Sequence, residues 1–183
     1  MPAKQNEKNV ILTNREKLLY STSVQAELEE KLAYTRVGAP YEGLPENYWP
    51  NMVVSWNENP QDLIFSFDSG FPDWISPSTT IVGRVSVNDI YAHLADNSRI
   101  ENAAELWGIE TEDKVCEIIG RWMNGVSITP PALCPEGERI IIAGGNHRFN
   151  VARLCGETTI AFFTADKYRI FFDSILPSVQ WNS

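Results

Sequence analysis

Two consecutive glycines, Gly144 and Gly145, separate a run of mostly β-branched residues from a helical pattern. The run Arg139–Ala143 predicts a strand, and Asn146–Leu154 predicts a helix that is closed by Gly156. Backbone N–H groups and the helix dipole favour an anion at such a helix start, and glycines permit a sharp turn and a close approach. The pattern predicts a small α/β unit, roughly Arg84 to Lys167, that binds a phosphate group at Gly144–Arg148.

The side chains that follow the glycines suit this chemistry. Arg148 supplies a permanent charge and a planar fork that matches phosphate oxygens. His147 can donate a hydrogen bond or act as an acid or base. A structural explanation stays open, because so short a pattern also occurs where two glycines only make a tight turn and the arginine pairs with a nearby acid.

Further elements are expected on both sides of the turn. The strongest helical pattern runs from Glu110 to Asn124, with Thr111 as its cap and Gly125 as its end. Its predicted apolar face consists of Val115, Ile118, Ile119 and Trp122. The remaining expected elements are a strand at Thr80–Val87, short helices through Ile90 and Leu94 and at Glu101–Trp107, strands at Ala132–Cys134 and Thr158–Phe163, a hairpin turn at Pro135–Glu138, and a helix or strand at Tyr168–Leu176.

The first 79 residues are expected to form an N-terminal extension packed on a domain of residues 80–183. A helix is predicted from Asn14 to just before Gly38, followed by a loop rich in proline and aromatic residues. Short strands are predicted near Met52–Trp56 and Leu63–Phe67. The aromatic side chains between positions 41 and 74 could stack on nucleic-acid bases, but we favour their burial in the core.

Composition limits the function classes. The formal net charge of −9 argues against general coating of nucleic acid, which relies on many Lys and Arg contacts to phosphate. Without an apolar run of membrane-spanning length or an apolar signal-peptide segment, we expect a cytoplasmic protein with no membrane partner. Cys116, Cys134 and Cys155 are expected to be buried thiols, and two histidines, His93 and His147, exclude a His-rich metal site.

The order of these elements resembles the ParB/sulfiredoxin superfamily. The resemblance is closest over about 40 residues and looser over about 80. Its motifs are Gly125-Val126 after a helix, a strand preceded by Pro130-Pro131, a Gly-x-x-Arg turn, an Ala-bearing helix, Gly156 and a final strand with Ile160. The resemblance implies a mixed α/β fold of this type, carrying an N-terminal helical and aromatic-rich extension.

The same resemblance implies a function. In this superfamily the glycine turn binds nucleotide phosphates, so ATP or another nucleotide is the expected ligand and cofactor. The sulfiredoxin branch has a catalytic cysteine where this chain has Asn146, and an amide cannot form a thiolate, so sulfiredoxin activity is not expected. The few residues after Lys167 are too short for the helix-turn-helix domain of the chromosome-partitioning branch. Stand-alone members include ParB-like nucleases and a plasmid fertility-inhibition protein, which suggests a plasmid or phage context.

For nucleotide hydrolysis we expect Asn146, His147 and Arg148 to be the catalytic residues. Gly144 and Gly145 join them in binding the nucleotide, and Ser127 and Thr129 either meet phosphate or are simply exposed polar residues. Mg²⁺ would accompany the phosphates, with Asp89, Glu136 and Glu138 as unranked ligand candidates, so the metal ligands stay unknown.

Two further roles stay open. Cleavage of DNA would need a positive path, for which Lys114, Arg121, Arg139, Arg148 and Arg153 are candidates unless they are scattered, ion-paired surface residues. Alternatively, the protein binds a protein partner without catalysis, for example as an inhibitor of conjugation or of host defence, and keeps the glycine turn for its structure.

Overall fold

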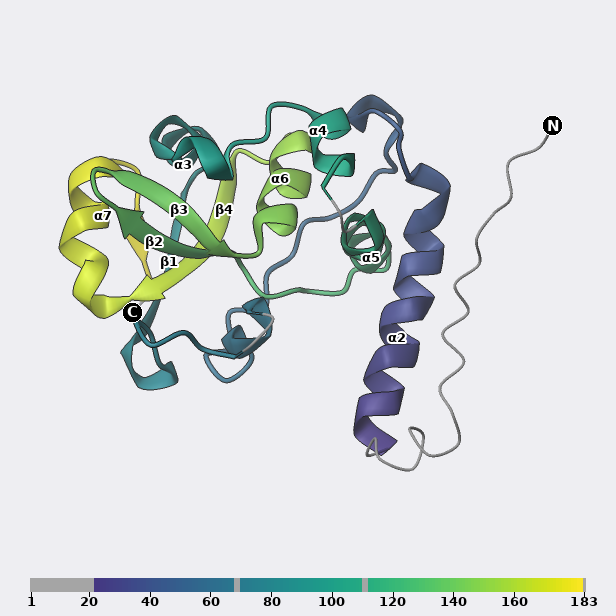
Figure 1. The fold of residues 1–183 in the computed structure, drawn as a ribbon, viewed down its shortest axis with the longest axis horizontal. Helices are drawn as coiled ribbons and strands as arrows, with labels where there is room; N and C mark the ends of the chain where they lie inside the picture. Colours follow the sequence, from purple (N-terminus) through teal and green to yellow (C-terminus); the bar gives the residue numbers. More distant parts are fainter. Residues whose placement is uncertain (1–21, 68–69, 110–111, 183) are drawn as a thin grey trace.

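The structure is a computed structural model that describes residues 22–67, 70–109 and 112–182. Over these residues the chain is a mixed α/β protein with six α-helices and one open five-stranded sheet of order β3-β2-β4-β1-β5 (Figure 1). No helix in this part of the chain is both long and apolar enough to cross a membrane. The predicted starting residue of the first helix, Asn14, and the predicted cap Thr111 lie outside the described ranges.

The sheet is organised around one buried central strand. β4 (Thr159–Ala165) is buried at every residue after Thr159, because it has a neighbour on each side and layers on both faces. β1 (Thr80–Ser86) pairs with it antiparallel along its full length, and β5 (Gln180–Trp181) pairs with the other edge of β1. The hairpin of β2 (Ala132–Glu136) and β3 (Arg139–Gly144) joins β4 in parallel through the single pair Ala132↔Phe163.

This topology places the glycine turn beside the middle of the sheet. Gly144 at the end of β3 pairs with Ala132, which is the same residue that pairs with Phe163 of β4. The chain then enters α6 (Asn146–Leu154), which connects the hairpin to β4. The start of α6 therefore lies where three strands meet.

Two apolar clusters cover the two faces of the sheet. The strand alternation of β4 sends Ile160 and Phe162 into the larger cluster, and Phe163 and Ala165 into the smaller one. The larger cluster includes the predicted face of α5 (Glu112–Met123), whose four apolar residues are all buried. It also takes in side chains from α3 (Val87–His93), α4 (Ala103–Trp107), α6 and α7 (Arg169–Ile175).

The aromatic-rich segment packs mainly into these clusters, as predicted. Trp56 meets Trp122 edge to face with ring centroids 5.4 Å apart, and Trp49 meets Trp107 at 6.1 Å. Phe67 contacts Phe71, Trp74 and Phe163 in the smaller cluster. Burial of aromatic surface therefore fastens this segment to α4 and α5 and, through Phe67, to the sheet.

Both strands predicted in this segment were wrong. Residues 63–66 form a 3-10 helix (η3, Leu63–Ser66), since Leu63 and Ser66, three residues apart, are the buried pair while Phe65 points to solvent. Residues 52–55 are irregular, and Trp56 makes one isolated bridge to Ile128. The ambiguous tail at Tyr168–Leu176 is helical, as α7.

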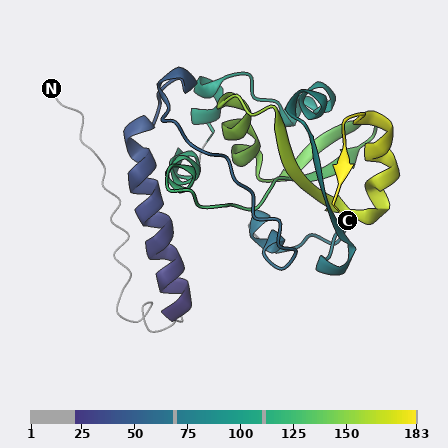
Figure 2. The same ribbon diagram turned by 180° about the vertical axis from the view of Figure 1, so that it is seen from behind.

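α2 (Thr22–Gly38) packs against α5 at the side of the molecule away from the sheet, as Figures 1 and 2 both show. Two glycines bring the helix backbones together. A Cβ added to Gly38 would stand 1.9 Å from the Cys116 carbonyl oxygen, and one added to Gly120 would stand 2.0 Å from the Tyr34 carbonyl oxygen. The outer side of α2 exposes Leu28 and Leu32, at 43% and 45%.

The cysteines divide by environment. All three are free thiols, as expected, and Cys116 is buried between α5 and α2. Cys134 on β2 is partly buried. The prediction that Cys155 is buried was wrong, because it follows the last turn of α6 at the surface.

Candidate functional site

The predicted strand, glycine turn and helix are present at the predicted positions. Gly145 is the N-cap of α6 and has a left-handed conformation, with φ 80° and ψ 27°. Residues with a Cβ rarely adopt this conformation, which explains a glycine here. The first bond of the helical ladder runs from the Phe149 N–H to the Gly145 carbonyl, so the N–H groups of residues 146–148 point along the axis toward the helix start.

Gly144 has a different structural role. A Cβ at this position would stand 2.4 Å from the carbonyl oxygen of Ser66, so the absence of a side chain lets η3 pack directly on the turn. The sequence pattern predicted a close approach between the turn and a ligand. At Gly144 the close approach is instead between the turn and the backbone of Ser66. η3 thereby becomes one wall of the site.

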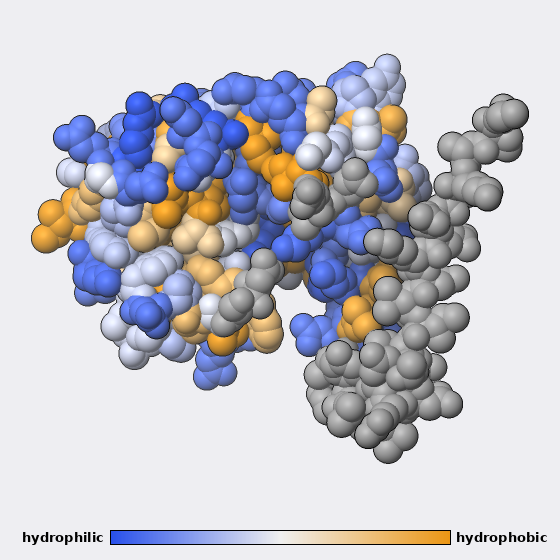
Figure 3. All heavy atoms as spheres, in the orientation of Figure 1, coloured by the Kyte–Doolittle hydropathy of each residue, from blue (hydrophilic) through white to orange (hydrophobic). Residues whose placement is uncertain are grey.

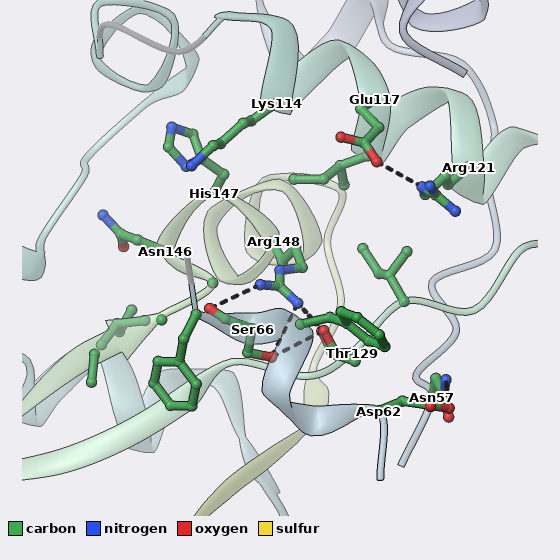
Figure 4. A pocket seen from close by; sticks show the side chains of 18 of the residues that line it. Asn57, Asp62, Ser66, Lys114, Glu117, Arg121, Thr129, Asn146, His147 and Arg148 are labelled. Atoms are coloured by element: carbon green, nitrogen blue, oxygen red, sulfur yellow. Dashed lines mark hydrogen bonds and ion pairs between the residues drawn. The ribbon is translucent and has the colours of Figure 1, made fainter. Parts of the chain in front are cut away.

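Arg148 connects the turn to two distant segments (Figure 4). Its Nη1 donates to the Thr129 carbonyl oxygen at 2.7 Å, to the Thr129 hydroxyl, and to the Ser66 hydroxyl at 3.2 Å. Its Nη2 donates to the Ser66 carbonyl oxygen at 3.4 Å. The Ser66 hydroxyl in turn lies 3.0 Å from the Thr129 hydroxyl and the Pro130 carbonyl oxygen. The guanidinium therefore fastens η3 and the segment leading to β2 onto α6.

Ser127 and Thr129, the other predicted phosphate contacts, both line the cleft but differ in exposure. Thr129 is 7% exposed, and its hydroxyl belongs to the Arg148 network. Thr129 is therefore not the exposed polar residue of one interpretation, and its contact with phosphate stays a prediction. Ser127 is exposed, and its hydroxyl lies 2.6 Å from that of Ser55.

A cleft of about 970 Å³ opens at the turn. Gly144–Arg148 forms one wall, residues of α2 and α5 form a second wall, and η3 with other lining residues between Asn57 and Trp74 forms a third. Figure 3 shows the molecule hollowed between its sheet side and its α2 side, with largely hydrophilic walls in view. Such a volume is typical of a site for a small organic ligand.

The two ends of this cleft differ in their charged groups. Figure 4 shows Lys114 of α5 and His147 of α6 directed toward each other above the glycine turn, and both line the cleft. Farther along α5, Arg121 pairs with Glu117 at 2.9 Å and with Glu30 of α2 at 3.6 Å. The end of the cleft nearest the turn is therefore the end suited to an anion.

Asn146 presents a donor at this end. Its side-chain oxygen accepts from the Nδ2 of the fully buried Asn150 at 3.0 Å, which fixes the amide orientation. The Asn146 Nδ2 is thus turned outward, as Figure 4 shows. This geometry suits contact with an anionic oxygen rather than with a metal ion, which would need the amide oxygen.

Among the residues that the structure describes, no group of three or more His, Cys, Asp or Glu is placed to hold a metal ion. The candidates named from sequence do not line the cleft. Glu136 and Glu138 lie at the hairpin end of β2 and β3, opposite the glycine turn, and Asp89 accepts a hydrogen bond from Ser178. These three assignments were wrong as ligands for a metal at this turn.

The predicted basic path does not form one surface. Arg139 donates to the Leu94 carbonyl oxygen at 3.3 Å, and Arg153 donates to the Ile100 carbonyl oxygen and lies 4.5 Å from the Tyr91 ring centroid. Neither of these lines the cleft, whereas Lys114, Arg121 and Arg148 do. His93 makes a contact within its own helix, with its Nδ1 2.8 Å from the Asp89 carbonyl oxygen.

Residues from distant segments complete the site. Ser66 and Phe65 come from the segment taken for a strand, and Glu27, Glu30 and Lys31 come from α2. No local pattern in the sequence pointed to any of them, because their place at the site depends on packing between distant segments.

The fold and the cleft define a mixed α/β protein with a polar site at a strand-to-helix turn. Comparisons of this chain with protein-family models, with curated proteins and with solved structures each find no match. The functional proposal therefore rests on the geometry above and on the sequence pattern.

Proposed function

We propose that this protein binds the phosphate groups of a nucleotide, ATP or a related one, in the cleft at the start of α6, and hydrolyses it. The observation that carries the proposal is the left-handed conformation of Gly145, which directs the positive end of α6 toward the cleft. Lys114 and His147 also line this cleft. Helix start, ammonium and imidazole together form an anion site with both fixed dipoles and charge.

We further propose that residues 80–183 form a ParB/sulfiredoxin-like domain and that residues 1–79 extend it. In support, the order α5, β2, β3, glycine turn, α6, β4 agrees with the order of elements that the resemblance implies. Asn146 at the third position of the turn excludes thiolate chemistry there, so hydrolysis by water replaces the sulfiredoxin reaction in this proposal.

Each residue of the turn has its own part in this proposal. The Asn146 Nδ2 and the side chains of Lys114 and His147 contact phosphate oxygens, and His147 takes the proton of the attacking water. Arg148 is a positioning residue, because its fork binds Ser66 and Thr129, and its charge adds to the field at the turn. Mg²⁺ would reach the cleft bound to the nucleotide, and we assign it no protein ligands.

The test is calorimetric titration of ATP–Mg²⁺, with CTP and GTP alongside, into the wild type and a His147→Ala variant, followed by phosphate-release assays. Lys167→Ala, which removes a charge outside this cleft, is the matched control. We expect binding that is at least tenfold weaker in His147→Ala and unchanged in Lys167→Ala. A wild type that binds none of the nucleotides would overturn the proposal, and binding without phosphate release would remove its hydrolytic part.

Cleavage of DNA at the same cleft is a subordinate proposal, since water attack on a phosphodiester needs the same groups plus a positive path. The dispersal of Arg139 and Arg153 away from the cleft weighs against a long strand. Incubation of supercoiled plasmid with the protein and Mg²⁺ or Mn²⁺ tests it, and plasmid that stays supercoiled would exclude it.

One observation favours the alternative of a protein-binding role. Leu28 and Leu32 lie four residues apart on one side of α2, and both are more than 40% exposed. A non-catalytic interaction protein would use such a helix side and would bind no nucleotide. The titration described above therefore separates the two roles.

A further inference from the structure

Phe65 differs from the other exposed apolar residues because it lines the cleft. Ten large hydrophobic side chains are exposed among the residues that the structure describes, and Phe65, at 66%, is the one that lines the cleft. Tyr48 is exposed to a similar extent, at 64%, but lies outside the cleft. A large apolar ring that faces a polar ligand site is a candidate binding surface.

The backbone that carries this ring is held on both sides. Leu63 is fully buried in the smaller core cluster, and Ser66 is bound by Arg148 through its hydroxyl and carbonyl oxygens. The Phe65 N–H donates to the Asp62 carbonyl oxygen at 3.0 Å. Ordering the ring against a ligand therefore costs little backbone entropy.

The Phe65 ring differs from the nearby Phe67 ring in its aromatic contacts. Phe67, two residues on, contacts three aromatic rings of the core, whereas no ring-to-ring contact within the described ranges involves Phe65. The neighbouring Ser66 carbonyl touches the glycine turn at Gly144. Phe65 thus belongs to the η3 wall of the cleft and is the direct neighbour of the residue that contacts the glycine turn.

We infer that Phe65 stacks on the base of the bound nucleotide, so the ligand is a nucleoside phosphate rather than inorganic phosphate or a phosphorylated sugar. This inference rests on the proposed function. Every nucleobase has a π-face, so stacking on one ring adds affinity without selecting one base. The cleft volume accommodates a whole nucleoside triphosphate, with the phosphates at Gly145–His147 and the base over η3.

The experiment compares ATP with inorganic tripolyphosphate, which keeps the phosphate chain and lacks the nucleoside. Both are titrated into the wild type, Phe65→Ala, Phe65→Trp and the matched control Tyr48→Ala, with circular dichroism as a check of folding. We expect Phe65→Ala to weaken ATP roughly 5- to 150-fold and to leave tripolyphosphate unchanged. Phe65→Trp should retain ATP binding, and Tyr48→Ala should change neither ligand.

The outcomes separate this inference from the function beneath it. If both ligands bind the wild type equally and Phe65→Ala affects neither, the base site is wrong and the phosphate site stands. If neither ligand binds the wild type, the phosphate site is wrong and the inference falls with it. If Phe65→Ala weakens both ligands to the same degree, the ring acts on the phosphate site and the base assignment is overturned.

Discussion

Arg148 donates through Nη1 to the carbonyl oxygen of Thr129 at 2.7 Å, and the same guanidinium donates to Ser66, which lies 82 positions earlier in the chain. An arginine that joins three segments stabilises the fold as well as the site. Removing it leaves buried oxygens without their charged donor, which costs about 1–3 kcal/mol. We expect Arg148→Met to lower the free energy of unfolding by about 2 kcal/mol in urea titrations.

The matched control is Arg36→Met at the exposed end of α2, where no change beyond about 0.5 kcal/mol is expected. Arg148→Lys should recover part of the loss, because an ammonium keeps the charge but not the fork. Equal unfolding midpoints for Arg148→Met and the wild type would show that the network contributes nothing to stability.

Gly144, before α6, and Gly156, after it, should respond differently to alanine. Gly144→Ala places a Cβ 2.4 Å from the Ser66 carbonyl oxygen and should displace η3, at a cost of about 2–3 kcal/mol. Gly156→Ala, at φ 89° with open space around its Cβ, carries the left-handed penalty of about 1–2 kcal/mol alone. Thermal unfolding gives both values, and nucleotide titration should show that Gly144→Ala alone weakens binding.

The contact between α2 and α5 depends on Gly120. A Cβ there would stand 2.0 Å from the Tyr34 carbonyl oxygen, so Gly120→Ala should separate the two helices and cost about 1–3 kcal/mol. Hydrogen exchange over residues 22–38 should accelerate. Gly108→Ala, whose Cβ would stand 3.4 Å from its nearest neighbour, serves as the control. Unchanged exchange in Gly120→Ala would mean that α2 does not depend on this contact.

Cys134 should react slowly with alkylating reagents at neutral pH. Burial raises the pKa of its thiol above the usual value, and the thiolate is the reactive form. In a Cys116→Ser, Cys155→Ser variant, the rate should fall below that of N-acetylcysteine at pH 7.5. It should rise about tenfold per pH unit until the pH passes the raised pKa. A rate equal to that of the free thiol would contradict this.

The sequence predicted correctly those features that depend on the residues of a single helix or turn. The spacing of Val115, Ile118, Ile119 and Trp122 predicted the buried face of α5, and the Gly144-Gly145 break predicted the start of α6. It failed at Leu63–Phe67, where alternation predicted a strand but burial of Leu63 and Ser66 selects a 3-10 turn. It also missed the partners of Arg148, because Ser66 and Thr129 are brought to it by packing of distant segments.

The pair Gly38 and Gly120 also has a consequence for recognising related chains. A protein could carry the same Gly-Gly-Asn-His-Arg turn and still lack the α2 wall of the cleft, if bulky residues stood at the two crossing positions. The whole cleft has a discontinuous sequence signature of four positions. It consists of small residues at the positions equivalent to Gly38 and Gly120, and of hydroxyl residues at those equivalent to Ser66 and Thr129. A search with that four-point spacing would find proteins that share the whole cleft, and not merely the turn.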